Sequence, residues 1–385
     1  MEARNPPEAV TEELSESLRA GATLPASWYT AESVFRQETR AIFSRYWQYA
    51  CRLDEVAHPG DYLACRAGNI PVVVVRNLNN EVAAFVNVCR HRGAEIVLAG
   101  SRGNRNTLQC HYHAWTWDLD GRLRAAPGAA DEPCFRNEDY PLTPLAVGLL
   151  GQFLFVRPDP QAPGWDETIG GLPRELLAAT PPLATLRFRE RRTYDMTANW
   201  KIVVENFLEC YHCAIAHKGF ADLIDLKEYT VTPHRYCSTQ RGPLKASAKT
   251  RADATCFLTE GGGQEGLYNY IWPNFMVNLY PGRGNASTNL ILPVAPGRTL
   301  AIYDFYFEEG MQEAAPMVAF IDQVQREDVL ICESVQRGLN SGFYDQGRLM
   351  IQYEKGIQHF ERLVVEALTR PERREGPPTD RPGGG

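Results

Sequence analysis

The chain has 385 residues, of which 44% are hydrophobic and 23% charged, values typical of a globular protein with one large or two ordinary domains. Its formal net charge of −7 argues against a nucleic-acid-binding protein, because phosphate contacts require a basic surface. No apolar run approaches the roughly 20 residues of a membrane span, and residues 1–18 lack the pattern of a secretory signal. We therefore expect a cytoplasmic protein whose ten cysteines are thiols and metal ligands more than disulfides.

The first part of the chain changes from a helical pattern to a strand pattern. Residues 1–44 predict an arm followed by a helix, because apolar residues recur at helical spacing from Ala31 to about Tyr46. Short β-branched and aromatic runs follow, such as Ile70–Arg76 and Phe153–Val156, and turn residues separate them. We expect a compact antiparallel domain over residues 45–160.

Two loops in this β region each carry one cysteine and one histidine. The first has Cys89 and His91, and the second, after eighteen intervening residues, has Cys110 and His113. A Rieske [2Fe–2S] centre needs two cysteines on one iron and two histidines on the other, so two mixed loops fit it well. A Cys₂His₂ zinc site is the alternative, but zinc fingers usually keep the two cysteines in one pair and the two histidines in another. His111 is a further histidine in the second loop, and the spacing favours His113 as the ligand.

The stretch from Glu205 to His217 contains a second candidate metal site. His212 and His217 are five residues apart, which on a helix is a rotation of about 140° past one full turn. The helix must therefore be distorted or end for both rings to reach one ion. Two imidazoles and one carboxylate form the facial triad of a non-haem Fe(II) oxygenase. Two surface histidines on an amphipathic helix are the alternative, and the upstream cysteine–histidine loops favour the metal site.

The C-terminal part combines long strands with one long helix. A linker rich in proline and glycine precedes a strand expected at Arg187–Met196. Aromatic strands recur between residues 268 and 307 and precede a helix at Ala315–Gln336. This order predicts a curved antiparallel sheet wrapped on a helix, in a domain of residues 161–369. The tail, residues 370–385, consists of proline, glycine and charged residues and is expected to be disordered.

Two segments together resemble a known family. The cysteine–histidine loops, followed by Trp117–Leu123, resemble the Rieske domain of ring-hydroxylating oxygenase α subunits. Residues 199–217 resemble the start of the catalytic iron domain of the same proteins. The resemblance covers roughly residues 24–365 and implies an α+β chain. An all-β Rieske domain would precede a helix-grip catalytic domain, and the arm at residues 1–44 would pack on the catalytic domain.

The chain departs from the family pattern in the second loop. His111 stands where the family usually has proline, and Ala114 where it usually has glycine. A turn that requires a positive φ would accommodate Ala114 poorly, because only glycine adopts that backbone without steric cost. The departure concerns the geometry and redox potential of the cluster loop more than cluster binding.

The resemblance also implies roles for acidic residues. The segment Gln325–Asp328 is similar to the family segment whose aspartate completes the triad, so Asp328 is the expected third iron ligand and Glu327 is the alternative. In the family, an acid at the position of Glu209 bridges a Rieske histidine of one subunit and an iron-ligand histidine of the next. A carboxylate suits this role because it can accept a hydrogen bond from each imidazole. Glu209 is therefore expected to serve electron transfer in catalysis, within a homotrimer.

The implied reaction uses O₂ and electrons that come from another protein. A ferrous ion activates O₂ but needs electrons one at a time, and a Rieske centre stores one electron. No convincing Gly-x-Gly-x-x-Gly motif follows a strand, so the chain is not expected to bind NAD(P)H itself. The electrons of NAD(P)H are expected to arrive through a separate reductase or ferredoxin.

The most similar branch of the family contains the choline, betaine and carnitine monooxygenases. Glu209 stands where most members have aspartate, and Cys332–Leu339 and Gly356–Phe360 are also similar to this branch. It implies hydroxylation or N-demethylation of a small quaternary ammonium substrate. A trimethylammonium group is attracted to aromatic faces. Candidate residues for such a cage lie on the expected strands: Tyr268, Trp272, Phe275 and Tyr280.

Other interpretations remain. The same metals could hydroxylate or O-demethylate a small aromatic acid, whose carboxylate would bind Arg283 or Lys245. Alternating aromatic residues can also be ordinary sheet core. Outside the enzyme class, the alternatives are an electron-transfer Rieske protein and a zinc-binding structural protein. The second metal site argues against the former, and the mixed ligand spacing argues against the latter.

Overall fold

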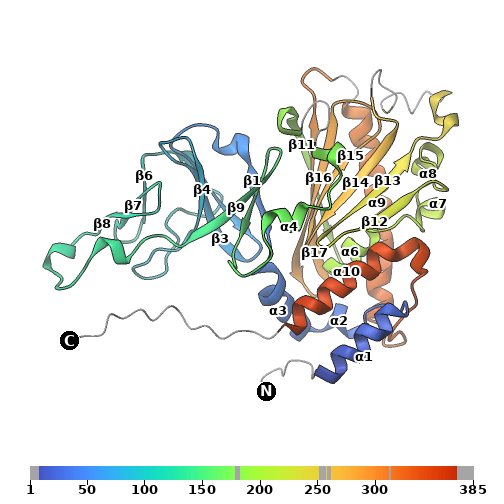
Figure 1. Ribbon diagram of the computed structural model, residues 1–385, viewed down its shortest axis with the longest axis horizontal. Coiled ribbons are helices and arrows are strands. Elements are labelled where there is room, and N and C mark those ends of the chain that lie inside the picture. Colours follow the sequence, from blue (N-terminus) through green and yellow to red (C-terminus); the bar gives the residue numbers. More distant parts are fainter. Residues whose placement is uncertain (1–7, 178–182, 251–256, 258–261, 312–313, 371–385) are drawn as a thin grey trace.

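The computed structural model describes residues 8–177, 183–250, 257, 262–311 and 314–370. The tail that the sequence predicts to be disordered lies, beyond Arg370, outside the described residues. The described part has an N-terminal helical segment, a domain of short strands and a C-terminal domain with a second large sheet (Figure 1). No helix within these described ranges is long and apolar enough to cross a membrane.

The N-terminal segment lies against the C-terminal domain. Its helices are α1 (Glu8–Arg19), α2 (Ser27–Thr30) and α3 (Glu32–Glu38), and a π-helical turn, Thr39–Phe43, continues α3. The predicted helix from Ala31 to Tyr46 is therefore α3 with this turn. Buried apolar side chains of the segment share one core with residues of the C-terminal domain: Leu18, Leu24, Tyr29, Phe43, Trp200 and Phe360. The burial of these side chains holds the segment in place.

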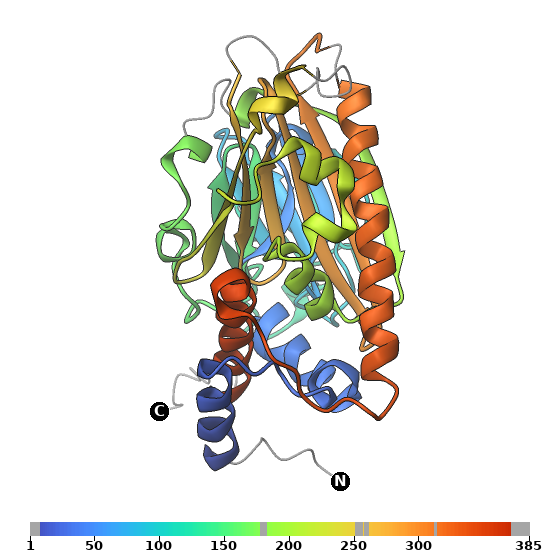
Figure 2. The ribbon, with the colours of Figure 1, turned by 90° about the vertical axis from the view of Figure 1, so that its right-hand side faces the viewer.

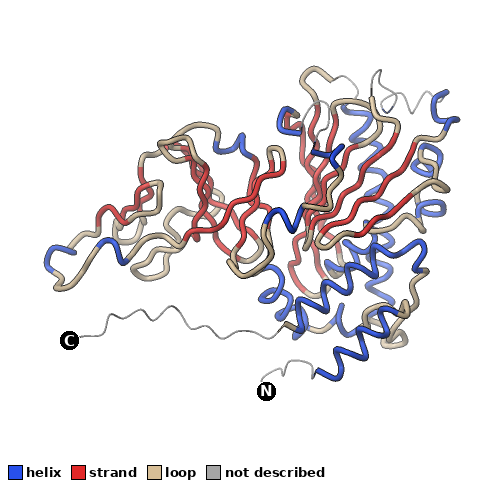
Figure 3. The backbone as a smooth tube through the Cα atoms, viewed as in Figure 1, coloured by secondary structure: helices blue, strands red, loops and turns tan. Residues whose placement is uncertain are grey.

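The first domain is an antiparallel β structure. Its main sheet has the strand order β1-β10-β9-β4-β3-β2-β5, and a small sheet of β6, β7 and β8 lies beyond it. The strands are β1 (Gln48–Arg52), β2 (Asp61–Ala67), β3 (Ile70–Arg76), β4 (Val82–Val86), β5 (Arg102–Asn104), β6 (Thr107–Gln109), β7 (Thr116–Asp118), β8 (Leu123–Ala125), β9 (Pro144–Leu150) and β10 (Phe153–Arg157). Figure 3 shows these strands as a group separate from those of the C-terminal domain.

The C-terminal domain is a seven-stranded antiparallel sheet with the order β11-β17-β16-β15-β14-β13-β12. Its strands are β11 (Arg187–Met196), β12 (Thr230–Pro233), β13 (Cys237–Pro243), β14 (Glu265–Ile271), β15 (Phe275–Leu279), β16 (Asn285–Ala295) and β17 (Arg298–Phe307). Its helices are α4 (Trp165–Ile169), α5 (Arg174–Leu177), α6 (Trp200–Phe207), α7 (Cys213–Ala216), α8 (Lys218–Leu223), α9 (Ala314–Leu339) and α10 (Ile351–Thr369). The sheet and the long helix α9 confirm the α+β class expected from the sequence.

The two faces of the C-terminal sheet have different neighbours. Side chains alternate between the faces of a strand, and on β15 Met276 belongs to the core beneath the helices whereas Phe275 and Val277 belong to a second core. The second core includes Trp47 and Phe153 of the N-terminal domain. Figure 2 shows α7, α8 and α9 in front of the sheet and the N-terminal domain behind it. One face of the sheet therefore supports the helices, and the other carries the N-terminal domain.

Candidate functional site

Helix α6 places the second candidate metal site. Asn199 caps its N-terminus, since the side-chain oxygen accepts a hydrogen bond from Lys201 N at 2.9 Å. The ammonium group of Lys201 is fully buried and pairs with Glu38 of α3. After α6 ends, the chain turns so that His212 directly precedes the four-residue helix α7 and His217 directly follows it. Helix α6 thus ends before both histidines, and the short α7 ends before His217, which lets residues five apart face one point.

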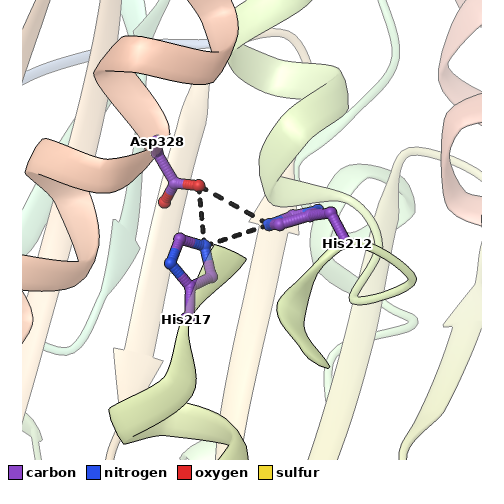
Figure 4. Close-up of side chains that lie close together, drawn as sticks. All are labelled: His212, His217 and Asp328. Carbon is purple, nitrogen blue, oxygen red and sulfur yellow. Dashed lines mark hydrogen bonds and ion pairs between the residues drawn. The ribbon is translucent and has the colours of Figure 1, made fainter. Parts of the chain in front are cut away.

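His212, His217 and Asp328 converge. The two Nε2 atoms are 3.1 Å apart, and Asp328 Oδ1 lies 2.9 Å from His217 Nε2 and 3.5 Å from His212 Nε2. Figure 4 shows the three side chains pointing toward a common point, with the aspartate on α9. Within the described ranges, this is the group of histidine, cysteine and acidic side chains with metal-binding spacing.

Two further carboxylates orient the imidazole rings. His212 Nδ1 donates a hydrogen bond to Glu209, and His217 Nδ1 donates one to Glu327 Oε2 at 2.7 Å. These bonds place the proton of each neutral ring on Nδ1, so each Nε2 offers a lone pair to the common point. Glu327, which the sequence left as an alternative iron ligand, therefore contacts the far side of a ligand ring, and Asp328 faces the common point.

The protonation preferences follow from this convergence. Burial lowers the pKa of His212, but the Asp328 and Glu209 carboxylates outweigh it and raise that pKa to about 10. Burial and the carboxylates of Asp328 and Glu327 compete in the same way at His217, and its pKa is raised. Burial acts to raise the pKa of Asp328, and the two imidazoles outweigh it and lower that pKa. The site thus attracts a cation, whether a proton or a metal ion.

The donor set fits a ferrous ion. Ligands at right angles and about 2.1 Å from one ion stand roughly 3 Å apart, close to the 2.9–3.5 Å separations of the three ligand atoms. Two lone pairs and a carboxylate oxygen would repel one another without a positive charge between them. The three ligand atoms lie on one side of the convergence point, as in a facial triad, which leaves coordination positions open on the other side.

The two cysteine–histidine loops also come together. Cys89 and Cys110 are buried in the core of the N-terminal domain, and burial raises the pKa of Cys89, to which the neighbouring Cys110 thiol contributes. The rings of His91 and His113 lie at the surface with centroids 4.6 Å apart. The His91 ring stacks on Trp115 at 5.1 Å. Two buried thiols and two exposed imidazoles are the donor set of a Rieske cluster. The histidine ring that contacts His91 is that of His113.

The loops have the same backbone geometry. The fourth residue after each cysteine donates its N–H to the cysteine carbonyl, from Gly93 to Cys89 and from Ala114 to Cys110, both at 3.0 Å. Gly93 has φ 73° and Ala114 has φ 56°. The positive φ that the sequence raised as a difficulty for Ala114 is therefore present, and the alanine bears its steric cost.

A cavity of about 110 Å³ adjoins the convergence point of His212, His217 and Asp328. Aromatic residues form much of its wall: Phe220, Tyr229, Phe257, Tyr268, Tyr280 and Phe320. The Tyr229 and Tyr268 rings are nearly parallel with centroids 6.4 Å apart, and the Tyr280 ring meets that of Tyr268 edge-on at 5.9 Å. Such faces attract a cation.

Only two of the four residues predicted to bind substrate line this cavity. Tyr268 and Tyr280 do, whereas Trp272 packs on Tyr46 and Phe360 at the end of the sheet. Phe275 lies in the core on the opposite face of the sheet. Consecutive side chains of a strand point to opposite faces, so Phe275 and Met276 of β15 belong to different cores. The prediction was therefore wrong for Trp272 and Phe275.

Neither basic candidate for binding an aromatic acid reaches the cavity. Lys245 donates a hydrogen bond to the Ala221 carbonyl, and Arg283 pairs with Glu308 at 3.2 Å. Among the described residues that line the cavity there is no lysine or arginine.

Sequence reasoning missed three features of the site. Cys210 and Cys213 form a disulfide that closes the loop of His212, which corrects the expectation of thiols at these positions. The other missed features are polar cavity residues, Gln240 and Asn278. Asn278 is two residues before Tyr280, so the period of two in an extended chain could have placed it on the same face.

Comparison with known proteins agrees with this geometry. Residues 46–136 match the family model of the Rieske [2Fe-2S] domain, and residues 183–370 match that of the ring hydroxylating alpha subunit (catalytic domain). The carnitine monooxygenase oxygenase subunit of Acinetobacter baumannii is 35% identical over 89% of this chain and 94% of its own length. The chain belongs to the Rieske ring-hydroxylating oxygenase family. This Rieske oxygenase is also similar to the chloroplastic choline monooxygenase of Amaranthus tricolor, with 33% identity over 90% of this chain and 78% of the relative.

A solved structure has the same architecture. A quaternary ammonium Rieske monooxygenase in complex with L-carnitine superposes with a TM-score of 0.76 at 32% identity, covering 90% of this chain and 95% of the other. The Rieske oxygenase described here is therefore an oxidoreductase of the non-haem iron type, with a Rieske cluster and a mononuclear iron as its family cofactors.

Proposed function

We propose that this chain is the terminal oxygenase component that hydroxylates or N-demethylates a small quaternary ammonium compound. One observation carries the proposal: the cavity beside the converging His212, His217 and Asp328 side chains has tyrosines and no basic residue among its described lining. A trimethylammonium group gains about 0.5–2 kcal/mol from each good aromatic contact. The similarity to a carnitine monooxygenase and a choline monooxygenase supports the same substrate class.

The metal ligands follow from the donor sets. Cys89, Cys110, His91 and His113 would hold the [2Fe–2S] cluster. The mononuclear iron would be held by His212, His217 and Asp328. When bound, the iron would supply oxygen activation and the cluster would supply single electrons. In the protein itself, Glu209 and Glu327 would orient the two histidine rings so that each Nε2 lone pair points toward the iron. The tyrosine rings would bind the substrate cation.

The electrons are proposed to start from NAD(P)H and to reach the cluster through a separate reductase. The carnitine monooxygenase relative is an oxygenase subunit, which implies that another subunit supplies its electrons. They would then cross between protomers. In Figure 1 the loop between β6 and β7, which carries two cluster ligands, lies at the end of the molecule opposite α7 and α8. A related structure is described in terms of inter-subunit electron transfer. We therefore propose a cytoplasmic homotrimer in which Glu209 links each iron site to the neighbour's cluster.

The surface next to Glu209 suits such a subunit contact. The rings of Tyr211 and Tyr353 stack at 5.0 Å and are 55% and 58% exposed, and Ile215 is 85% exposed. Large apolar side chains gathered at a surface mark an interaction site more often than isolated ones do. The exposed His91 and His113 rings would be the complementary tip of the neighbouring protomer.

Reductase-coupled O₂ uptake tests the substrate class. We expect uptake that is matched by product with choline, carnitine or betaine compounds, and none with small aryl acids. Product formed from an aryl acid alone would favour the second candidate, which the positions of Lys245 and Arg283 away from the cavity argue against.

Co-expression of two inactive variants tests the route of the electrons. His113→Ala should lose the cluster and His212→Ala the mononuclear iron. Mixed oligomers should regain activity if electrons cross between protomers, and sedimentation analysis should give three chains. Mixed oligomers without activity would contradict the link through Glu209.

A further inference from the structure

The disulfide between Cys210 and Cys213 encloses a ligand of the candidate iron site. The two cysteines are three residues apart, and His212 lies between them. The bond spans the turn between α6 and α7, directly after Glu209. Cys213 Sγ lies 4.0 Å from His212 Nε2, the nitrogen that faces the convergence point. The disulfide therefore fixes the backbone on both sides of a ligand residue.

The carboxylate of Glu209 depends on the same turn. It accepts hydrogen bonds from the backbone N–H groups of Tyr211 and His212, and from His212 Nδ1. Tyr211 and His212 are the two residues that the disulfide encloses. Without the sulfur–sulfur bond, the turn would have more backbone conformations open to it, and holding it in one of them would cost entropy. The bond therefore helps to hold both the ligand ring and the carboxylate that orients it.

A disulfide is exceptional for the compartment proposed above. In reducing compartments disulfides are rare, and those that occur are usually transient, catalytic or redox-sensing. The other described cysteines are free thiols: Cys51, Cys65, Cys89, Cys110, Cys134, Cys237 and Cys332. The one pair that is bonded stands at the iron site, which indicates a redox-sensing role.

The disulfide lies where a small thiol can approach it. Both cysteines line the cavity next to the convergence point. Cys210 is partly exposed, whereas Cys213 is 5% exposed. Thiol–disulfide exchange begins when a thiolate attacks one sulfur and the other sulfur leaves as a thiolate. We therefore expect the attack at Cys210, with Cys213 as the leaving group.

We propose that Cys210 and Cys213 are positioning residues whose redox state controls the iron site. With the disulfide formed, Glu209 and His212 are held in the arrangement that binds iron. With the disulfide reduced, the turn loosens and the affinity for iron falls. This inference rests on the proposed function, because it concerns the regulation of the same site.

The redox step is a thiol–disulfide exchange with a dithiol. The sulfur–sulfur bond of the protein breaks, and a mixed disulfide with the reductant forms at Cys210. The second thiol of the reductant then attacks this mixed disulfide. Two electrons and two protons pass to the protein, which gains two thiols, while the reductant becomes a disulfide. Exchange with an oxidised dithiol reverses the step.

The wild-type protein tests the inference without any variant. Anaerobic samples are equilibrated with reduced or oxidised dithiothreitol, and a thiol reagent counts the reactive cysteines in each. Competition with a chelator then measures the affinity for the mononuclear iron. We expect two additional thiols after reduction and an affinity lowered by about 10–100-fold, the range found when contacts that orient a metal ligand are lost. Reoxidation should restore the affinity, and the visible bands of the reoxidised cluster should be unchanged.

Two variants give the matched comparison. The double variant Cys210→Ser/Cys213→Ser removes the bond with little change in side-chain size. It should have the lower affinity of the reduced wild type in both dithiothreitol conditions. Cys134→Ser removes an exposed free thiol and keeps the disulfide, so it should respond as the wild type does. Both variants must keep the cluster bands and the wild-type elution volume.

The results that would overturn the inference are distinct from those that would remove the proposed function. Equal iron affinity in the oxidised and reduced wild type, or tighter binding after reduction, would overturn it. The same holds for a thiol count that does not change between the two conditions, and for a double variant with the affinity of the oxidised wild type. None of these measurements needs a substrate. A redox-dependent iron affinity in a protein that turns over no quaternary ammonium compound would retain the control by the disulfide and remove the proposed substrate class.

Discussion

The Glu327 carboxylate lies 2.7 Å from Nδ1 of His217, whereas Nε2 of the same ring faces Asp328 at 2.9 Å. Glu327 and Asp328 are consecutive on α9, yet they contact opposite sides of one imidazole. The aspartate can bind an ion at the convergence point, whereas the glutamate can only orient the His217 ring. The two acids should therefore differ in their effect on metal binding.

Asp328→Ala should lose the mononuclear iron, because the site then has two neutral imidazoles and no anionic ligand. Glu327→Gln should retain the iron with affinity lowered by about 10–100-fold, as is typical when a hydrogen-bond partner of a ligand is changed. Titration with a competing chelator measures both affinities, and the cluster spectrum reports on the unaffected domain. Loss of iron from Glu327→Gln with retention in Asp328→Ala would reverse the assignment.

Glu209 holds His212 and is proposed to reach the next protomer. Its carboxylate accepts hydrogen bonds from His212 Nδ1 and from the backbone N–H of Tyr211 and His212. In Glu209→Ala both metals should stay bound, and turnover should fall by at least about tenfold. Metal analysis and the rate at which the reduced cluster is reoxidised in the presence of substrate check the two parts. Turnover at the wild-type rate would exclude the bridging role.

Much of the fold could be predicted because its signals are local. The β-branched run of β3 and the alternating aromatic strands are properties of short segments, and Ile70–Arg76 has the bounds predicted for it. The ligand residues were found because each loop keeps its spacing in the sequence. Which face of the sheet borders the cavity depends on what packs on each side. Tyr268 therefore lines the cavity, whereas Phe275 lies in the core on the other face. The contact of Glu327 with His217 depends on a partner far along the chain.

Ala114 should bear strain that glycine would relieve. It occupies the position that Gly93 holds in the other loop, with φ 56°, and a non-glycine residue in this region costs about 1–2 kcal/mol. Ala114→Gly should therefore stabilise the cluster loop by about 1 kcal/mol, measured as a higher temperature for thermal loss of the visible cluster bands. Ala125→Gly, on the exposed end of β8, is the control and should lower that temperature slightly. A lower temperature for Ala114→Gly as well would show that the alanine side chain stabilises the loop.

Two glycines on the consecutive helices α9 and α10 should respond oppositely to alanine. A Cβ at Gly356 of α10 would lie 2.3 Å from the Leu208 carbonyl, just before Glu209. Gly356→Ala should destabilise the protein by about 1–3 kcal/mol through overpacking. At Gly338 of α9 an added Cβ meets no described atom within 4 Å, so Gly338→Ala should be neutral or stabilising by up to about 1 kcal/mol. Thermal midpoints compare the two, and equal effects would contradict the close approach of α10 to Leu208.

Glu361 should make stability depend on pH. It is fully buried, accepts hydrogen bonds from Leu24 N at 2.9 Å and the Tyr29 hydroxyl at 3.3 Å, and shares that hydroxyl with Glu205. Burial raises the pKa of Glu361 from 4.5 to about 7, and burial together with Glu361 raises that of Glu205. The folded state therefore binds more protons than the unfolded state between about pH 4.5 and 7. Stability should fall as the pH rises through this window, because Glu361 ionises at a lower pH in the unfolded state than in the folded state.

Glu361→Gln removes the ionisation and tests the size of this effect. Each pKa unit corresponds to about 1.4 kcal/mol, so the variant should gain roughly 3 kcal/mol over the wild type at pH 8. The difference should shrink toward pH 5, where Glu361 is already neutral in the folded state. Glu366→Gln on the same helix is the control, because Glu366 is partly exposed beside Arg235 and Arg370. Thermal midpoints at pH 5 and 8 provide the comparison. If the gap between Glu361→Gln and the wild type were constant with pH, Glu361 would be ionised in the folded protein throughout this range, with its charge balanced by the buried Lys201 near Glu205.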